Sequence, residues 1–160
     1  YPEIAIAGVN IKYKWGSLLR TKKERPDFLL GFSSNVALIK LFPGFDVEIY
    51  KELFDVNRSK AIVIESFGSG NAPSSTKFQK YISSFIEKGG VILNITQCSS
   101  GEVKQGAYKT SSFFNKAGVM SGRDMTTEAA ITKLMFLLGN YDDMSEIRSL
   151  LSESMAGEMT

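Results

Sequence analysis

From Asn35 onward, the chain alternates short apolar runs with segments of helical periodicity. Runs typical of strands span 36–42, 60–65 and 91–95, and the last two are apolar enough to be buried on both faces. Between the second and third runs, apolar residues recur at i, i+3, i+4, i+7 and i+8, as they do on one face of a helix: Phe78, Tyr81, Ile82, Phe85 and Ile86. Strands that are apolar on both faces are typical of parallel sheets. The order therefore predicts a βαβ series with right-handed crossovers.

Capping signals predict where the first two helices begin and end. Asp46 follows the Pro-Gly turn at 43–44 and is expected to cap a helix with one apolar face, formed by Ile49, Leu53 and Phe54. Ser74 or Ser75 is expected to cap the second helix. Gly89 and Gly90 end it, because a left-handed position after a helix favours glycine.

Three further helices are predicted in the last third of the chain. The first covers 110–116 and is stopped by Gly118. The second lies near 126–138 and carries apolar residues expected on one face: Ile131, Leu134, Met135 and Leu138. The third begins around Asp143, whose spacing to Glu146 resembles a capping box. Residues 1–32 are less regular, and we interpret them as an arm or linker that precedes an α/β domain over 33–160.

Composition narrows the class of protein. With 160 residues, of which 43% are apolar and 22% charged, the chain is expected to form one globular domain. A net charge of +2 predicts no general affinity for nucleic acid, and no apolar run approaches the roughly 18 residues that a membrane span needs. The basic run at 20–25 is either a solvated turn or a phosphate-binding patch. A first residue other than methionine suggests a cleaved or excised chain.

The residue types that are missing exclude several chemistries. The chain has no histidine, which rules out Ser-His-Asp and Cys-His nucleophile pairs and most catalytic zinc sites. Its single cysteine, Cys98, excludes an intrachain disulfide and fits a reducing compartment. No metal or cofactor is expected.

Two loops rich in small and polar residues directly follow the predicted buried strands, at 66–73 and 96–101. Ligands of parallel sheets bind at this edge. Gly68 and Gly70 lack the third glycine or the lysine of nucleotide-binding loops, so they either belong to a ligand site or only permit a tight turn. Thr96 and Cys98 are candidate nucleophiles without a visible base, and Cys98 is alternatively a small buried hydrophobe.

Three stretches together resemble one enzyme family. E-S-F-G-S-G-N-A-P (65–73), N-I-T-Q-C (94–98) and D-M-T-T-E-A-A-I-T-K-L (124–134) follow the order and spacing found in type I L-asparaginases. The opening Y-P-x-x-x-x-x-G-V-x-I (1–11) and the closing A-G-E-M-T (156–160) are similar to the same family, although Ala156 stands where arginine is usual. The resemblance covers essentially the whole chain and matches the C-terminal half of these enzymes.

The resemblance implies a flavodoxin-like C-terminal α/β domain, a three-layer fold with a mostly parallel sheet flanked by helices. Family members hydrolyse asparagine to aspartate and ammonia with threonine nucleophiles of the N-terminal domain, which are absent here, so no catalytic residue is expected in this chain. The family's dimers imply that Asn71, with Gly70 and Ser69, completes the neighbour's substrate site. Asn71 alternatively caps a helix or occupies a left-handed turn position.

The resemblance also implies a second site and a cellular setting. Some bacterial type I enzymes bind asparagine as an effector near residues that match Thr96 and Cys98. Glu65 stands where some of them carry an arginine, and its charge would repel an effector's α-carboxylate. The family implies a cytoplasmic homodimer or tetramer acting on asparagine. The alternatives are a stand-alone binding module for a small amino acid or anion, and a purely structural assembly domain.

Overall fold

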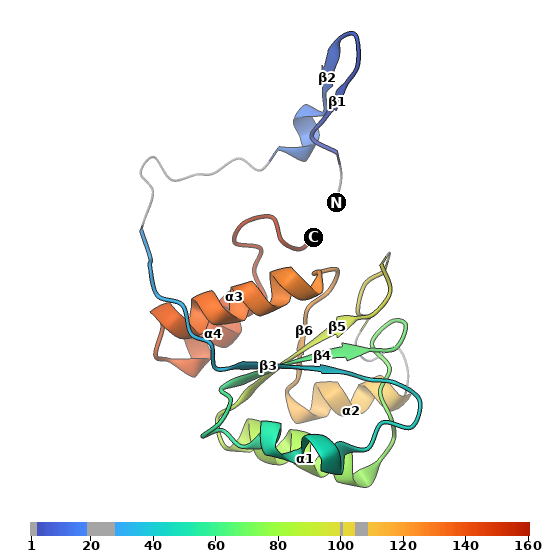
Figure 1. The fold of residues 1–160 in the computed structure, drawn as a ribbon, viewed down its shortest axis with the longest axis vertical. Helices are drawn as coiled ribbons and strands as arrows, with labels where there is room; N and C mark the ends of the chain where they lie inside the picture. The colour runs from blue at the N-terminus through green and yellow to red at the C-terminus, as the bar shows by residue number, and fades with distance from the viewer. Residues whose placement is uncertain (1–2, 19–27, 100, 105–108) are drawn as a thin grey trace.

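The computed structural model describes residues 3–18, 28–99, 101–104 and 109–160, without the side chains of 109–111. Its centre is a four-stranded parallel sheet in the order β3-β4-β5-β6 (Figure 1). The strands are β3 Val36–Lys40, β4 Ala61–Ser66, β5 Val91–Thr96 and β6 Met120–Ser121. The parallel sheet predicted from the buried apolar runs is confirmed.

Helical elements cover both faces of the sheet, which makes three layers (Figure 1). One face packs against η2 Val47–Phe54, α1 Thr76–Glu87 and α2 Lys109–Ala117. The other face packs against α3 Thr127–Asn140 and α4 Met144–Leu151. Every residue of β4 and β5 is buried, because side chains that alternate between the two faces enter two separate apolar cores.

Side-chain caps fix the helix boundaries. The Ser75 hydroxyl accepts a hydrogen bond from the Phe78 N–H at the start of α1, and Gly89 ends that helix with φ +92°. Asp143 caps α4 through the Ser145 N–H at 2.8 Å. These caps confirm the predicted starts and ends.

Two predicted apolar faces are wrong in detail. The segment after Asp46 is a 3₁₀ helix, so Ile49 turns outward with 75% of its surface exposed, while Val47 and Phe54 are buried. The buried positions of α3 are Ala130, Lys133, Leu134 and Leu137. Of the predicted face, Leu134 is buried and Ile131 and Leu138 pack against the same core, whereas Met135 does not belong to it.

The first described residues form a separate hairpin. Strands β1 Ala5–Ala7 and β2 Ile11–Tyr13 pair antiparallel and are followed by η1 Trp15–Ser17. Every residue from 3 to 16 is exposed, and the hairpin projects away from the sheet in Figure 1. The basic run at 20–25 lies outside the described residues.

The chain returns to the domain at residues 31–33, which lie against the C-terminal end of α3. The Gly31 N–H donates to Asn140 Oδ1 at 2.9 Å, Asn140 Nδ2 donates back to the Gly31 carbonyl at 2.8 Å, and the Ser33 N–H donates to the Met135 carbonyl at 2.9 Å. Gly31 and Gly139 approach so closely that a Cβ on either would overlap the other segment's backbone. Across the described part of the chain, no helix has both the length and the apolar character that crossing a membrane requires.

Candidate functional site

The two polar loops begin side by side at the carboxyl edge of the sheet. Ser66, the last residue of β4, pairs in register with Thr96, the last residue of β5. The loops that follow both emerge at the same edge (Figure 1). This is the placement that the two buried strands predicted.

The loop after β4 is held by its own backbone. The Phe67 N–H donates to the Asn71 carbonyl at 2.9 Å, and the N–H groups of Asn71 and Gly70 donate to the Phe67 carbonyl at 2.8 and 3.1 Å. Gly68 and Gly70 have φ of +50° and +106°, the left-handed region where glycine is favoured. Asn71 is half-buried beside them.

Both alternative roles for Asn71 fail. Among the described residues, Arg123 is the only one other than glycine with a positive φ, so Asn71 does not occupy a left-handed position. The helix that follows is capped by Ser75. Left-handed turn geometry and the capping of α1 therefore do not account for an asparagine at this position.

The loop after β5 anchors the loop after β4. The Thr96 hydroxyl donates to the Gly68 carbonyl and accepts from the Cys98 N–H at 3.0 Å. Because this hydroxyl is engaged on both sides, its geometry suits holding a loop rather than attacking a substrate. Cys98 is exposed, so the prediction of a small buried hydrophobe is wrong.

Glu65 lies at the same edge but on the opposite face of the sheet. Its residue is 8% exposed, its carboxylate pairs with Lys40 Nζ at 3.2 Å, and it accepts a hydrogen bond from the Thr127 hydroxyl at the start of α3. The structure therefore brings Asn71, Gly68 and Thr96 together, and directs Glu65 towards α3.

A shallow polar pocket of about 170 Å³ lies between the β5 loop and the start of α3. Its lining includes two residues proposed from sequence, Thr96 and Cys98, together with Asp124 and Thr127. Asn71 is not part of this lining. The two candidate sites are therefore distinct, and Thr96 contributes to both.

Sequence reasoning missed two residues that organise this edge. Gln97 Nε2 donates to the Leu41 carbonyl and, at 2.8 Å, to the Glu65 carbonyl, which ties the ends of β3 and β4 together. Asn94 is fully buried in β5, and both polar atoms of its side chain lack a hydrogen-bond partner among the described residues. An unpaired buried amide costs roughly 1–3 kcal/mol. A polar residue inside the run V-I-L-N-I was the available signal.

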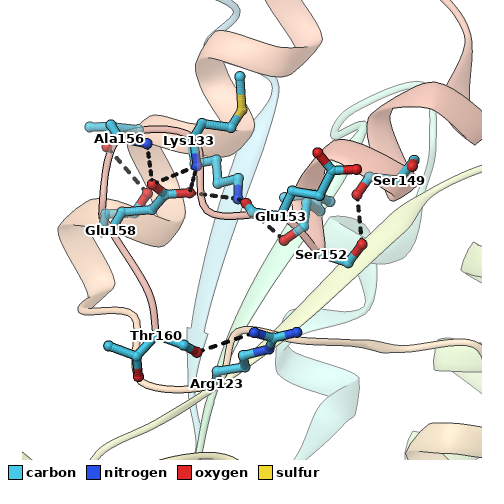
Figure 2. Close-up of polar contacts among 12 residues, drawn as sticks. Arg123, Lys133, Ser149, Ser152, Glu153, Ala156, Glu158 and Thr160 are labelled. Carbon is cyan, nitrogen blue, oxygen red and sulfur yellow. Dashed lines mark hydrogen bonds and ion pairs between the residues drawn. The ribbon is translucent and has the colours of Figure 1, made fainter. Parts of the chain in front are cut away.

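A second cluster of polar groups holds the C-terminal segment, residues 152–160, against α3 (Figure 2). Lys133 Nζ forms an ion pair with Glu158 Oε1 at 2.6 Å, with side chains 4% and 12% exposed. Lys133 also donates to the carbonyls of Leu151 and Glu153. Nearby, Asp124 accepts hydrogen bonds from the backbone and hydroxyl of Thr160, at 2.9 and 2.7 Å. The segment thereby braces a residue that lines the polar pocket.

The Glu158 carboxyl predicts a pH dependence of stability. Burial opposes its ionisation, but hydrogen bonds from Lys133 and from the N–H groups of Ala156 and Met155 outweigh burial and lower its pKa from 4.5 to about 2. Because the unfolded chain then binds more protons than the folded one between these values, this contribution is complete above pH 4.5 and is lost as the pH falls towards 2. Thermal melts should show that Glu158→Gln loses stability at about pH 6 and that the difference from wild type shrinks below about pH 4. A stability difference between Glu158→Gln and wild type that does not change with pH would contradict the lowered pKa of Glu158.

No group of three or more potential metal ligands of the His, Cys, Asp or Glu type occurs within the described parts of the chain. The polar atoms at the sheet edge are hydroxyls, amides, backbone groups and the carboxylates of Glu65 and Asp124. Such an arrangement can hold a small polar ligand by hydrogen bonds.

Comparison with known proteins gives one consistent family. Residues 35–151 match the sequence model of the Glutaminase/Asparaginase C-terminal domain. L-asparaginase 1 of Escherichia coli K12 is 36% identical over 125 residues, which are 78% of this chain and 37% of that protein. The 60 kDa lysophospholipase of Homo sapiens is 36% identical over 127 residues, which are 79% of this chain and 22% of that protein.

The fold matches as well. The crystal structure of L-asparaginase I from Vibrio cholerae superimposes with a TM-score of 0.90 and 30% identity over 100% of this chain and 48% of that one. The chain thus spans less than half the length of each of these relatives.

Proposed function

Because this chain belongs to the Glutaminase/Asparaginase C-terminal domain family, we propose that it is the C-terminal domain of an L-asparaginase. In the longer protein, asparagine would be hydrolysed to aspartate and ammonia by threonine nucleophiles of a preceding domain. The chain itself supplies no catalytic residue and is expected to be inactive alone. Within the predicted arm, the exposed hairpin region at residues 3–16 would pack against that preceding domain, which accounts for its uncovered apolar side chains.

The loop after β4 is the part of this domain that would reach a substrate. Asn71, flanked by Gly70 and Ser69, would complete the active site of a neighbouring subunit and contact the ligand's α-amino group. The observation that carries the proposal is the loop itself: backbone bonds and the Thr96 hydroxyl hold it at the carboxyl edge of the sheet, where parallel sheets bind their ligands. The assembly would be a homodimer or tetramer in the cytoplasm.

Replacing Asn71 with alanine in the full-length protein should lower kcat/KM about tenfold or more, the equivalent of one hydrogen bond to a charged group. Steady-state kinetics with asparagine measure the loss, and size-exclusion chromatography should show unchanged assembly. Asn115→Ala, at an exposed position of α2, is the matched control and should stay within about twofold. An unchanged kcat/KM in Asn71→Ala would favour a purely structural role.

Mixing subunits tests whether Asn71 acts across an interface. The first variant is Asn71→Ala, and the second lacks the catalytic threonine of the preceding domain. Mixed dimers should regain activity, because one site then combines an intact threonine with an intact Asn71. If mixing restores nothing, Asn71 serves its own subunit or no site at all.

The polar pocket beside Thr96 and Cys98 would be the effector site of the full protein. Glu65 disfavours an anionic group there, although Lys40 offsets part of its charge at 3.2 Å. Calorimetry on this chain alone should show no heat with asparagine or aspartate, because the sites are completed by other parts of the assembly. Measurable binding by the isolated chain would instead indicate a stand-alone binding module.

A further inference from the structure

Asn94 lies directly behind the Asn71 loop. Its side chain is fully buried on β5, on the face of the sheet that carries Thr96. A Cβ built on Gly70 would lie 3.2 Å from Asn94 Nδ2 and 2.9 Å from a methyl group of Val103. The backbone of the loop therefore packs on the amide with no side chain between them.

The amide and the loop carry complementary groups that are both unpaired. Asn94 Nδ2 is a donor without an acceptor among the described residues. Between residues 67 and 71, the Gly70 carbonyl is the only one without a hydrogen bond in the described part of the chain, since the other four accept from the loop itself, Lys104 or Thr96. The unpaired donor thus packs against the residue whose carbonyl is unpaired, one residue before Asn71.

Other buried polar groups nearby are satisfied. The Ser66 hydroxyl donates to the Ile95 carbonyl at 3.0 Å, and the Ser121 hydroxyl donates to the Val103 carbonyl at 3.3 Å. Among the residues that the structure describes, Asn94 alone has buried side-chain polar atoms without a partner. A buried amide that is left unpaired destabilises a fold, and such groups persist where function requires them.

We propose that Asn94 is a positioning residue for the Asn71 loop, and that its amide hydrogen-bonds the Gly70 carbonyl when Asn71 engages its ligand. Because Gly70 already packs against this amide with no side chain between them, the pairing requires a rearrangement of the loop backbone alone. Ligand binding and the pairing of this amide are then coupled, so the ligand-bound loop is the better satisfied state. This inference rests on the proposed role of Asn71.

Two variants in the full-length protein test the coupling. Asn94→Leu keeps the branched skeleton without polar atoms, and Asn94→Asp keeps the shape but lacks the amide donor. Both should raise KM for asparagine about fivefold with kcat within about twofold, while Asn94→Leu keeps or raises the melting temperature. A merely structural role would change the melting temperature and leave KM alone.

The control is Ser59→Ala, which removes a buried hydroxyl at the opposite end of the sheet, bonded to the Leu53 carbonyl at 2.6 Å. It should lower the melting temperature without changing KM. An unchanged KM in either folded Asn94 variant, alongside a large loss in Asn71→Ala, overturns the role of Asn94 alone. An unchanged kcat/KM in Asn71→Ala overturns the proposed function instead.

Discussion

Replacing Lys133 with methionine should lower the free energy of unfolding by about 3 kcal/mol, because removing one partner of a buried ion pair leaves the other uncompensated. The Lys133 side chain is 4% exposed, and its ammonium serves Glu158 and the carbonyls of Leu151 and Glu153 (Figure 2). Methionine retains an apolar stem of similar length, so the loss reports on the charge rather than on packing. Urea unfolding of the chain measures it.

A second variant separates the ion pair from the rest of the cluster. Combining Lys133→Met with Glu158→Gln removes both charges and should recover about 1 kcal/mol or more of the loss. Lys77→Met is the control, since its pair with Glu48 has side chains 70% and 39% exposed and is expected to contribute less than about 0.5 kcal/mol. Equal losses in Lys77→Met and Lys133→Met would show that burial does not strengthen the pair.

Replacing Gly139 with alanine should destabilise the chain by about 2 kcal/mol, the cost of overpacking against a fixed backbone. Helix propensity alone predicts the opposite sign, a gain of about 1 kcal/mol. The added Cβ would lie 2.4 Å from the backbone nitrogen of Phe32, so residues 31–33 must move away from α3. The hydrogen bonds between Gly31 and Asn140 would then be strained or lost.

Thermal melts decide the sign for Gly139→Ala. Gly16→Ala is the matched control, because a Cβ there meets no atom within 4 Å, and its melting temperature should stay close to that of the wild type. A higher melting temperature in Gly139→Ala would mean that residues 31–33 can leave α3 without cost.

The sequence predicts most of the central fold because its strands and caps are local signals. The apolar runs at 61–66 and 91–96 are buried on both faces, and Ser75 and Asp143 cap helices α1 and α4. The main error occurs where the local winding of the chain differs from the α-helix that the pattern predicted. Ile49 follows a helical stripe but is exposed, since the segment winds as a 3₁₀ helix.

Some features of the candidate site could likewise be predicted from sequence, and others could not. The loop after β4 could be placed from sequence, because a glycine pair directly follows a buried strand. The face of the sheet towards which Glu65 points could not be predicted, since the side chain at the end of a strand can point to either face. Its partners, Lys40 and Thr127, come from distant parts of the chain. The isolation of Asn94 depends on what its neighbours already bond, which no local pattern encodes.

The strand order has a consequence for the folding reaction. Each strand of the four-stranded sheet pairs with the next strand along the chain. A single crossover connection therefore separates the two strands of every pair, and no strand depends on a partner further away in the sequence. Nucleation can therefore begin at β4 and β5, the most buried pair, and extend outward in both directions. The ion pair of the C-terminal segment joins α3 to Glu158, which lies beyond α4 in the chain, so we expect it to close late in folding.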